Sequence, residues 1–204
     1  MTSRTTPAPR RTALALVLTP LLLGGLVIAA LAGLGLLSGA RALPALGGAS
    51  GTAADGEIPA GERVTVHDTD LPAIANLDPE LLAAVQRAAA DATAEGEGEF
   101  LVTSGWRSPD YQQRLLDDAV RVHGSEAEAA RWVARPETSR HVSGDAIDIG
   151  PFDATYWLSL HGAAYGLCQI YANETWHFEL RPEAVTEGCP EPYLDPTYDP
   201  RLRA

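Results

Sequence analysis

The chain has 204 residues, of which 46% are hydrophobic, and it carries a formal net charge of −12. Its first 41 residues contain four of the arginines and no acidic residue, so the rest of the chain is more acidic than the whole. This acidity argues against binding of nucleic acid, which requires cationic side chains to neutralise phosphates, and the length beyond residue 41 allows one domain with a buried core.

The N-terminal segment 1–41 is typical of a membrane-targeting sequence. Residues 12–37 carry no charge, and three arginines precede them. This run exceeds the roughly 7–15 apolar residues of a signal peptide and matches the roughly 20 that span a bilayer, which favours an uncleaved anchor. The alternative is a secretory signal cleaved near Ala40-Arg41-Ala42. Under either interpretation the positive-inside rule predicts that the following domain is extracytoplasmic.

Composition divides the rest of the chain into three parts. Residues 42–63 are rich in Gly, Ala and Ser, which predicts a flexible spacer. A single catalytic domain is predicted over 64–190. Prolines crowd the stretch that follows, so 191–204 is predicted to form an extended tail.

Helices and short strands are predicted to alternate within the domain. Asp78-Pro79 pairs an N-cap residue with proline at the first helical position, and apolar residues follow at helical spacing. Apolar residues at every second position of the last strand, Trp176 among them, predict that this face turns toward the core. The mixture indicates an α+β fold, a small mixed sheet with helices packed on it. Helices are predicted to begin at Pro79, Pro109 and Ser125 (ending before Pro136) and to run over 153–165, and strands over 100–104, 146–149, 167–171 and 176–180.

Cys168 and Cys189 are the only cysteines. Outside the cytoplasm an even number of cysteines predicts a disulfide, which would close a loop of about 20 residues and stabilise the fold by about 3 kcal/mol. The alternative, a thiol nucleophile or metal ligand, is disfavoured because neither residue lies in a reactive motif.

The segment 139–150, Ser-Arg-His-Val-Ser-Gly-Asp-Ala-Ile-Asp-Ile-Gly, offers two metal-binding side chains. His141 and Asp148 are separated by Gly144, which permits the tight bend that would bring an imidazole and a carboxylate to one cation. Taken alone, this segment would be interpreted as a surface loop that leads into an ordinary strand.

A second histidine follows in Glu174-Thr-Trp-His177. Two imidazoles and one carboxylate leave the fourth position of zinc open, as catalytic zinc sites require, and Glu174 would act on a water there. Because residues three apart in a regular strand face opposite sides, we expect Glu174 to lie in the turn before the strand.

A third segment, Ser104 to Gln112, joins a predicted strand to a predicted helix. Arg107 there is suited to grip a carboxylate or to stabilise an oxyanion. In isolation it would be interpreted as a surface arginine paired with one of the many acidic residues.

These three segments together resemble the VanY-like family of zinc D-alanyl-D-alanine carboxypeptidases, which are related to the D-Ala-D-Ala dipeptidases. The family pattern Ser-x-His-x-x-Gly-x-Ala-x-Asp is met at every fixed position between 139 and 148, and its Glu-x-x-His element is met at 174–177. Its Ser-Gly-Tyr-Arg-Ser segment is met at 104–108, with Trp106 in place of Tyr, and Thr175 replaces the usual Pro. The resemblance covers about residues 78–180.

The resemblance implies a residue-by-residue assignment of the site. It implies Zn2+ bound by His141, Asp148 and His177. It implies Glu174 as the catalytic base and Arg107 as a transition-state or substrate contact. It further implies substrate contacts from Ser108, Gln112 and Ser139.

The function that follows is release of the terminal D-Ala from peptidoglycan stem peptides by a zinc-dependent enzyme. Two alternatives remain within enzymes, a D-Ala-D-Ala dipeptidase and an endopeptidase that cuts elsewhere in the stem peptide. A third is a non-catalytic wall-binding module. The expected partners are a stem peptide ending in D-Ala and, through the N-terminal segment, the membrane.

Overall fold

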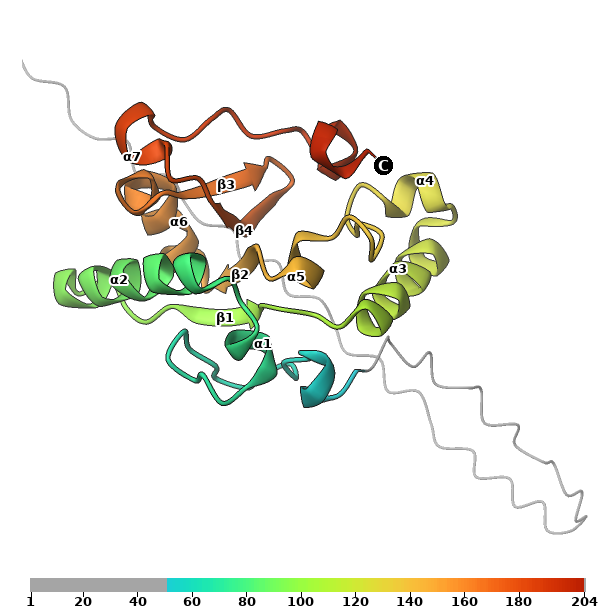
Figure 1. The fold of residues 1–204 in the computed structure, drawn as a ribbon, viewed down its shortest axis with the longest axis horizontal. Coiled ribbons are helices and arrows are strands. Elements are labelled where there is room, and N and C mark those ends of the chain that lie inside the picture. The colour runs from blue at the N-terminus through green and yellow to red at the C-terminus, as the bar shows by residue number, and fades with distance from the viewer. Residues whose placement is uncertain (1–50, 204) are drawn as a thin grey trace, which may run out of the picture. The chain divides into compact units, whose positions relative to one another are not determined.

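The computed structural model describes residues 51–203 of the chain, and the predicted anchor or signal segment lies outside them. Among the described residues, no helix combines the length and the apolar character that crossing a membrane requires. The domain contains a four-stranded sheet with helices around it (Figure 1), which confirms the α+β class.

The sheet has the strand order β1-β2-β4-β3. Its strands are β1 (Leu101–Ser104), β2 (Ala146–Gly150), β3 (Leu167–Tyr171) and β4 (Glu174–Leu180). All three strand pairs are antiparallel. The prediction of a mixed sheet is therefore wrong. β3 and β4 form a hairpin, and β2 lies in the interior of the sheet between β1 and β4.

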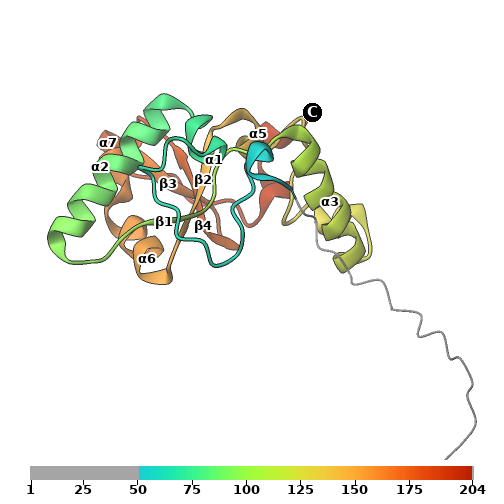
Figure 2. The ribbon, with the colours of Figure 1, turned by 90° about the horizontal axis from the view of Figure 1, so that it is seen from below.

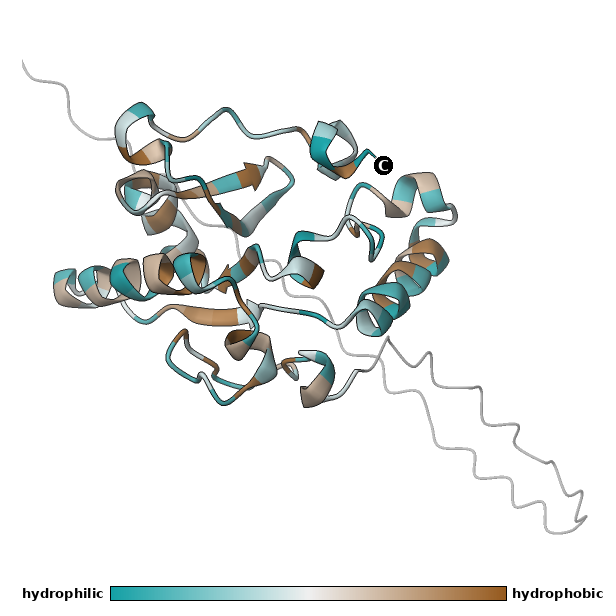
Figure 3. Ribbon diagram, in the orientation of Figure 1, coloured by the Kyte–Doolittle hydropathy of each residue, from teal (hydrophilic) through white to brown (hydrophobic). Residues whose placement is uncertain are grey.

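One face of the sheet carries the main hydrophobic core under α2 (Pro79–Glu95) and α6 (Phe152–His161). The Asp78 side chain accepts hydrogen bonds from the backbone N–H groups of residues 80 and 81, and Pro79 occupies the first turn, which confirms the predicted start of α2. Figure 3 shows brown and teal bands alternating along this helix, as expected for a helix with one buried side.

The pleat of the two central strands separates core from polar side chains. Ile147 and Ile149 of β2 and Phe178 of β4 are buried in the core. Asp148 lies between the two isoleucines, and its strand partner His177 directly precedes Phe178, so both point to the other face. The core under α2 and α6 therefore fixes the strands that carry a buried polar cluster on their opposite side.

A second group of helices lies at the other end of the domain. α3 (Pro109–His123) packs on the short α4 (Glu126–Ala129), and Figure 2 shows α3 and α2 at opposite ends. α4 ends well before Pro136, the predicted limit. The carbonyl of Arg131 accepts from the Asn173 side chain, and that of Ala134 from the Gln112 side chain, so tertiary hydrogen bonds replace those that would continue the helix.

The short elements lie mostly near the ends of the domain. Asp55, within the segment predicted as a spacer, accepts a hydrogen bond from the Ser108 hydroxyl at 2.9 Å. Residues 190–203, named the C-terminal segment below, contain two 3-10 turns and pack on the domain where the sequence predicts an extended tail. The remaining helical elements are η1 (Ala53–Asp55), α1 (Pro72–Ala75), α5 (Arg140–Ser143), η2 (Gly162–Tyr165), α7 (Ala184–Glu187), η3 (Pro196–Tyr198) and η4 (Pro200–Leu202).

A disulfide joins Cys168 of β3 to Cys189, which confirms the predicted pairing. Replacing both cysteines with alanine is expected to lower the free energy of unfolding by about 3 kcal/mol, because the bridge restricts the unfolded chain over 21 residues of sequence. Denaturant titration of the full chain measures this. Glu187→Ala, at an exposed site in the same loop, is the control, and a loss below about 1 kcal/mol would contradict the estimate.

Candidate metal centre

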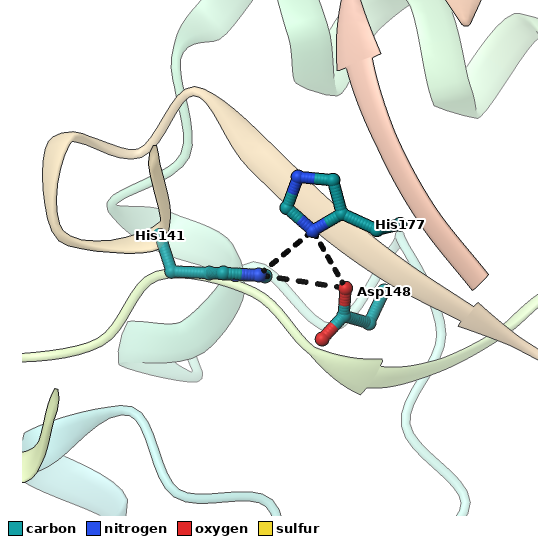
Figure 4. Close-up of side chains that lie close together, drawn as sticks. All are labelled: His141, Asp148 and His177. Carbon is teal, nitrogen blue, oxygen red and sulfur yellow. Dashed lines mark hydrogen bonds and ion pairs between the residues drawn. The ribbon is translucent and has the colours of Figure 1, made fainter. Parts of the chain in front are cut away.

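Three buried side chains from three elements converge on the polar face of the sheet. His141 comes from α5, Asp148 from β2 and His177 from β4, and Asp148 and His177 are direct partners in the strand register. Figure 4 shows the three side chains pointing toward one another. Their exposed fractions are 6%, 6% and 3%, so the cluster is withdrawn from bulk solvent.

The distances within the cluster match a tetrahedral zinc site. His141 Nε2 lies 3.2 Å from His177 Nδ1 and 3.4 Å from Asp148 Oδ1, and His177 Nδ1 lies 3.2 Å from the same oxygen. Ligands about 2.05 Å from a zinc ion at tetrahedral angles are about 3.3 Å apart. Two nitrogens and one oxygen are also a common donor set of catalytic zinc, so these residues fit the ion.

Hydrogen bonds behind each imidazole fix which nitrogen faces the cluster. His141 Nδ1 lies 2.8 Å from the carbonyl of Gly105, which can only accept, so Nδ1 carries the hydrogen and Nε2 presents its lone pair. His177 Nε2 lies 3.4 Å from Glu179 Oε1, which leaves Nδ1 for the cation. Carbonyl and carboxylate partners of this kind are typical of metal-binding histidines.

The carboxylates around the cluster favour a positive charge at His177. Burial would lower the pKa of His177, but its hydrogen bonds with Asp148 and Glu179 raise it to about 9. Burial lowers the pKa of His141, and the Arg107 charge lowers it further. Burial opposes ionisation of Asp148 as well, yet the two imidazoles hold its pKa well below the usual range. The centre thus keeps Asp148 ionised and His141 neutral.

Gly144 brings His141 to the strand. It ends α5 with φ of +82°, a conformation that glycine adopts readily, and its carbonyl accepts a hydrogen bond from the Asp78 backbone N–H at 2.9 Å. A Cβ at this position would lie 2.5 Å from the carbonyl oxygen of Asn76. The predicted tight bend is confirmed. Only a residue without a side chain allows the bend to lie this close to the connection between α1 and α2.

Glu174 is the first residue of β4, so its predicted location in the preceding turn is wrong. Gln169 of β3 pairs with Phe178 while Tyr171 pairs with Glu174, so β3 advances by two residues as β4 advances by four. This irregularity breaks the strict alternation of β4 and places Glu174 beside His177, with 3.8 Å between Glu174 Oε2 and His177 Nδ1. Burial raises the pKa of Glu174 to about 7.

Glu174 Oε1 is buried without a protein hydrogen-bond partner. Orphaned buried oxygens are rare because desolvation without a partner is costly. Because the other oxygen of the same carboxylate, Oε2, lies 3.8 Å from His177 Nδ1, the unpartnered Oε1 is the atom available to a water near the cluster.

The same irregularity overturns the prediction that Trp176 faces the core. Its side chain is 40% exposed, and Glu179, two residues after His177 on the polar face, is 1% exposed. Burial would raise the pKa of Glu179, but hydrogen bonds from His177 and Arg201 lower it to about 2. The family motifs do not include Glu179 or Arg201. The period-two spacing of Glu179 from His177 is the only sequence signal that could have indicated the first of them.

The Arg107 guanidinium donates three hydrogen bonds to side chains around the centre. Its Nη2 donates to Asp148 Oδ2 at 3.1 Å, its Nε to Ser104 Oγ at 2.8 Å and its Nη1 to Gln112 Oε1 at 3.1 Å. The Asp148 contact leaves Oδ1 directed at the two imidazoles. A guanidinium has five N–H groups, so two remain for another ligand.

The predicted substrate contacts occupy different surroundings. Ser139 is buried and lines a cavity of about 40 Å³ beside His141 and His177, together with Gln112. Ser108 instead accepts a hydrogen bond from the backbone N–H of Tyr111 and caps α3. The structure therefore brings Ser139 and Gln112 to the centre and uses the Ser108 hydroxyl to fix the helix start.

The small cavity adjoins a larger one. The larger cavity, about 570 Å³, shares Ala134, Pro196 and Leu202 with the small one. Pro196 and Leu202 belong to the C-terminal segment, so this segment forms a wall of both cavities. An extended ligand that reaches the metal centre would have space along this wall.

Comparisons with known proteins agree with the fold. Residues 74–183 match the family model described as VanY, D-alanyl-D-alanine carboxypeptidase. A curated D-alanyl-D-alanine carboxypeptidase of Enterococcus faecalis is 30% identical, and the match covers 50% of this chain and 50% of that protein. The chain therefore spans half the length of this relative.

Two solved structures are similar to the domain. VanYB in complex with D-alanine-D-alanine is 25% identical with a TM-score of 0.51, covering 65% of this chain and 88% of that one. A VanY D,D-pentapeptidase variant from a VanB-type resistance cassette, in complex with Zn(II), is 24% identical with a TM-score of 0.51, covering 65% and 90%. The second likeness shows the fold alone.

Proposed function

This chain belongs to the VanY family of D-alanyl-D-alanine carboxypeptidases, and we propose that it is a zinc-dependent enzyme that removes the terminal D-Ala from peptidoglycan stem peptides. The observation that carries the proposal is the buried triangle of His141, Asp148 and His177 beside the unpartnered oxygen of Glu174. The proposal includes an extracytoplasmic domain anchored to the membrane by segment 1–41, as its uncharged run predicts.

His141 Nε2, Asp148 Oδ1 and His177 Nδ1 would hold the ion. When bound, zinc supplies a Lewis acid that polarises a carbonyl and lowers the pKa of water. Glu174 accepts the proton of the attacking water at its free oxygen and returns it to the nitrogen of the departing D-alanine. Burial of the carboxyl group excludes competing solvent from this transfer.

Arg107 contributes through the two N–H groups that its protein partners leave free. Because its side chain lines the small cavity, these groups can donate to the substrate carboxylate or to the oxyanion that develops at the scissile carbonyl. Its bonds to Ser104, Gln112 and Asp148 hold the guanidinium in place before the substrate arrives. Ser139 and Gln112 form the adjoining part of the substrate pocket.

Product analysis with a defined pentapeptide stem tests the proposal. The zinc-loaded full chain is expected to release one equivalent of free D-alanine and leave a tetrapeptide, and a chelator followed by added zinc should abolish and restore the release. Release of intact D-Ala-D-Ala would assign a dipeptidase, and cleavage of an interior stem bond would assign an endopeptidase. A protein that binds zinc but leaves every stem peptide intact would overturn the proposal in favour of a wall-binding module.

A further inference from the structure

The C-terminal segment 190–203 lies outside the family match at residues 74–183, yet it packs beside the metal centre. Its backbone pairs with the β-hairpin at Tyr193, which donates to the carbonyl of Ile170 at 2.9 Å and accepts from the N–H of Ala172 at 2.8 Å. Farther along, Asp199 accepts a hydrogen bond from the Tyr171 hydroxyl at 3.0 Å. The segment is thus held by specific contacts on the side of β3 and β4.

Arg201 of this segment reaches the carboxylate behind the metal-binding imidazole of His177. Its Nη1 lies 2.7 Å from Glu179 Oε2 and its Nη2 lies 3.3 Å from Glu179 Oε1. Oε1 is the oxygen that faces His177 Nε2 at 3.4 Å. A continuous chain of hydrogen bonds therefore runs from Arg201 through Glu179 to His177.

Arg201 determines the orientation of the Glu179 carboxylate. Arg181 also donates to this carboxylate, but only to Oε2, at 2.7 Å. Among the described contacts, Arg201 is the group that engages both oxygens, and a planar guanidinium bound to both fixes the rotation of the carboxylate plane. That rotation sets the direction from which Oε1 meets His177.

Asp199 in turn holds Arg201. Arg201 Nε lies 2.9 Å from Asp199 Oδ1, and Asp199 is fully buried. Tyr171, which bonds Asp199 through its hydroxyl, has its ring centroid 5.0 Å from that of His177. The histidine is therefore supported on two sides by groups that the C-terminal segment itself fixes.

We propose that Arg201 is a positioning residue of the metal centre: through Glu179 it fixes the His177 imidazole, so the C-terminal segment is a working part of the zinc site. The inference rests on the proposed zinc site and not on the proposed reaction. Outer-shell partners of metal ligands typically change metal affinity by about 10–100-fold, which gives the scale of the effect.

Chelator competition on the zinc-loaded full chain measures this effect without substrate. Arg201→Met is expected to weaken zinc binding about tenfold, and Glu179→Gln by about 10–100-fold. Arg201→Lys keeps the charge but contacts one oxygen as a point donor, so it should recover part of the affinity. The matched control is Arg131→Met, which removes the ion pair between Arg131 and Asp195 of the segment (3.0 Å) but leaves Arg201 and Glu179 untouched, and it should bind zinc as the wild type does.

Each outcome separates positioning from simple tethering. Unchanged zinc affinity in Arg201→Met, with only a lowered melting temperature, would overturn the inference, and so would an equal loss in Arg131→Met. If Arg201→Met does not fold, Glu179→Gln and Arg201→Lys decide, since wild-type affinity in both would overturn it. Wild-type protein without zinc affinity would overturn the zinc site together with this inference, whereas zinc-loaded protein that releases no D-alanine would overturn the reaction alone.

Discussion

Replacing Glu174 with glutamine is expected to lower kcat for D-alanine release by about 10²–10⁴-fold, the contribution of a positioned general acid and base. The amide has nearly the same shape, so the packing around position 174 is preserved, but it cannot accept the proton of the attacking water. The three side chains proposed to bind the metal are untouched, so the variant should retain one zinc ion per chain. Turnover of a pentapeptide and zinc content, measured on the same preparation, test both statements.

The control for this variant is Glu187→Gln, an equal change at an exposed position of α7. It should leave turnover unchanged. A Glu174→Gln enzyme that turns over at the wild-type rate with zinc bound would remove Glu174 from the mechanism. A variant that has lost its zinc would instead show that Glu174 contributes to metal binding.

Gly144→Ala is expected to destabilise the protein by roughly 2–5 kcal/mol. Two costs add here: the left-handed backbone conformation is worth roughly 1–2 kcal/mol, and the displacement of neighbouring backbone roughly 1–3 kcal/mol. The displaced atom is the carbonyl oxygen of Asn76, which the new Cβ would approach to 2.5 Å. Because this backbone cannot move without disturbing the start of α2, the strain should also weaken the position of His141.

Gly124→Ala separates the two costs. Gly124 has φ of +81°, almost the same as Gly144, but a Cβ there would meet no atom within 4 Å. Its replacement should cost only the conformational part, roughly 1–2 kcal/mol. Denaturant unfolding of both variants with and without zinc measures the difference, and equal destabilisation of the two would show that the contact with Asn76 is unimportant.

The parts of this protein that the sequence predicted are those set by local rules. N-cap and proline signals located the starts of α2 and α3, and the motif around His141 and Asp148 located two residues of the metal centre because a turn and a strand bring them together over a short stretch. Their link to His177 rested on the donor types of the Glu174–His177 element and on the resemblance to a family, since composition and spacing alone do not show which strands are neighbours.

The failures arise where tertiary contacts override local patterns. Alternation predicted that Trp176 would be buried and that Glu174 would precede the strand, but the shifted register between β3 and β4 reverses both. α4 is short because the carbonyl groups of Arg131 and Ala134, which a longer helix would have used, accept hydrogen bonds from side chains distant in sequence. Arg201 belongs to no motif, and its proposed role follows only from the contacts that the folded C-terminal segment makes with Glu179.

The disulfide has a consequence for the metal centre beyond global stability. Glu179 and Arg201 are 22 residues apart in sequence, but Cys168 lies directly across from Glu179 in the β3–β4 ladder. Through the bridge to Cys189, the covalent path to Arg201 shortens to about a dozen residues. Whenever the C-terminal segment detaches, this shorter path raises the effective concentration of the Arg201 guanidinium at Glu179 roughly 2.5-fold. In a reducing medium Arg201 would therefore dissociate from Glu179 more often, and zinc affinity would become sensitive to the redox state of a bond that touches no ligand.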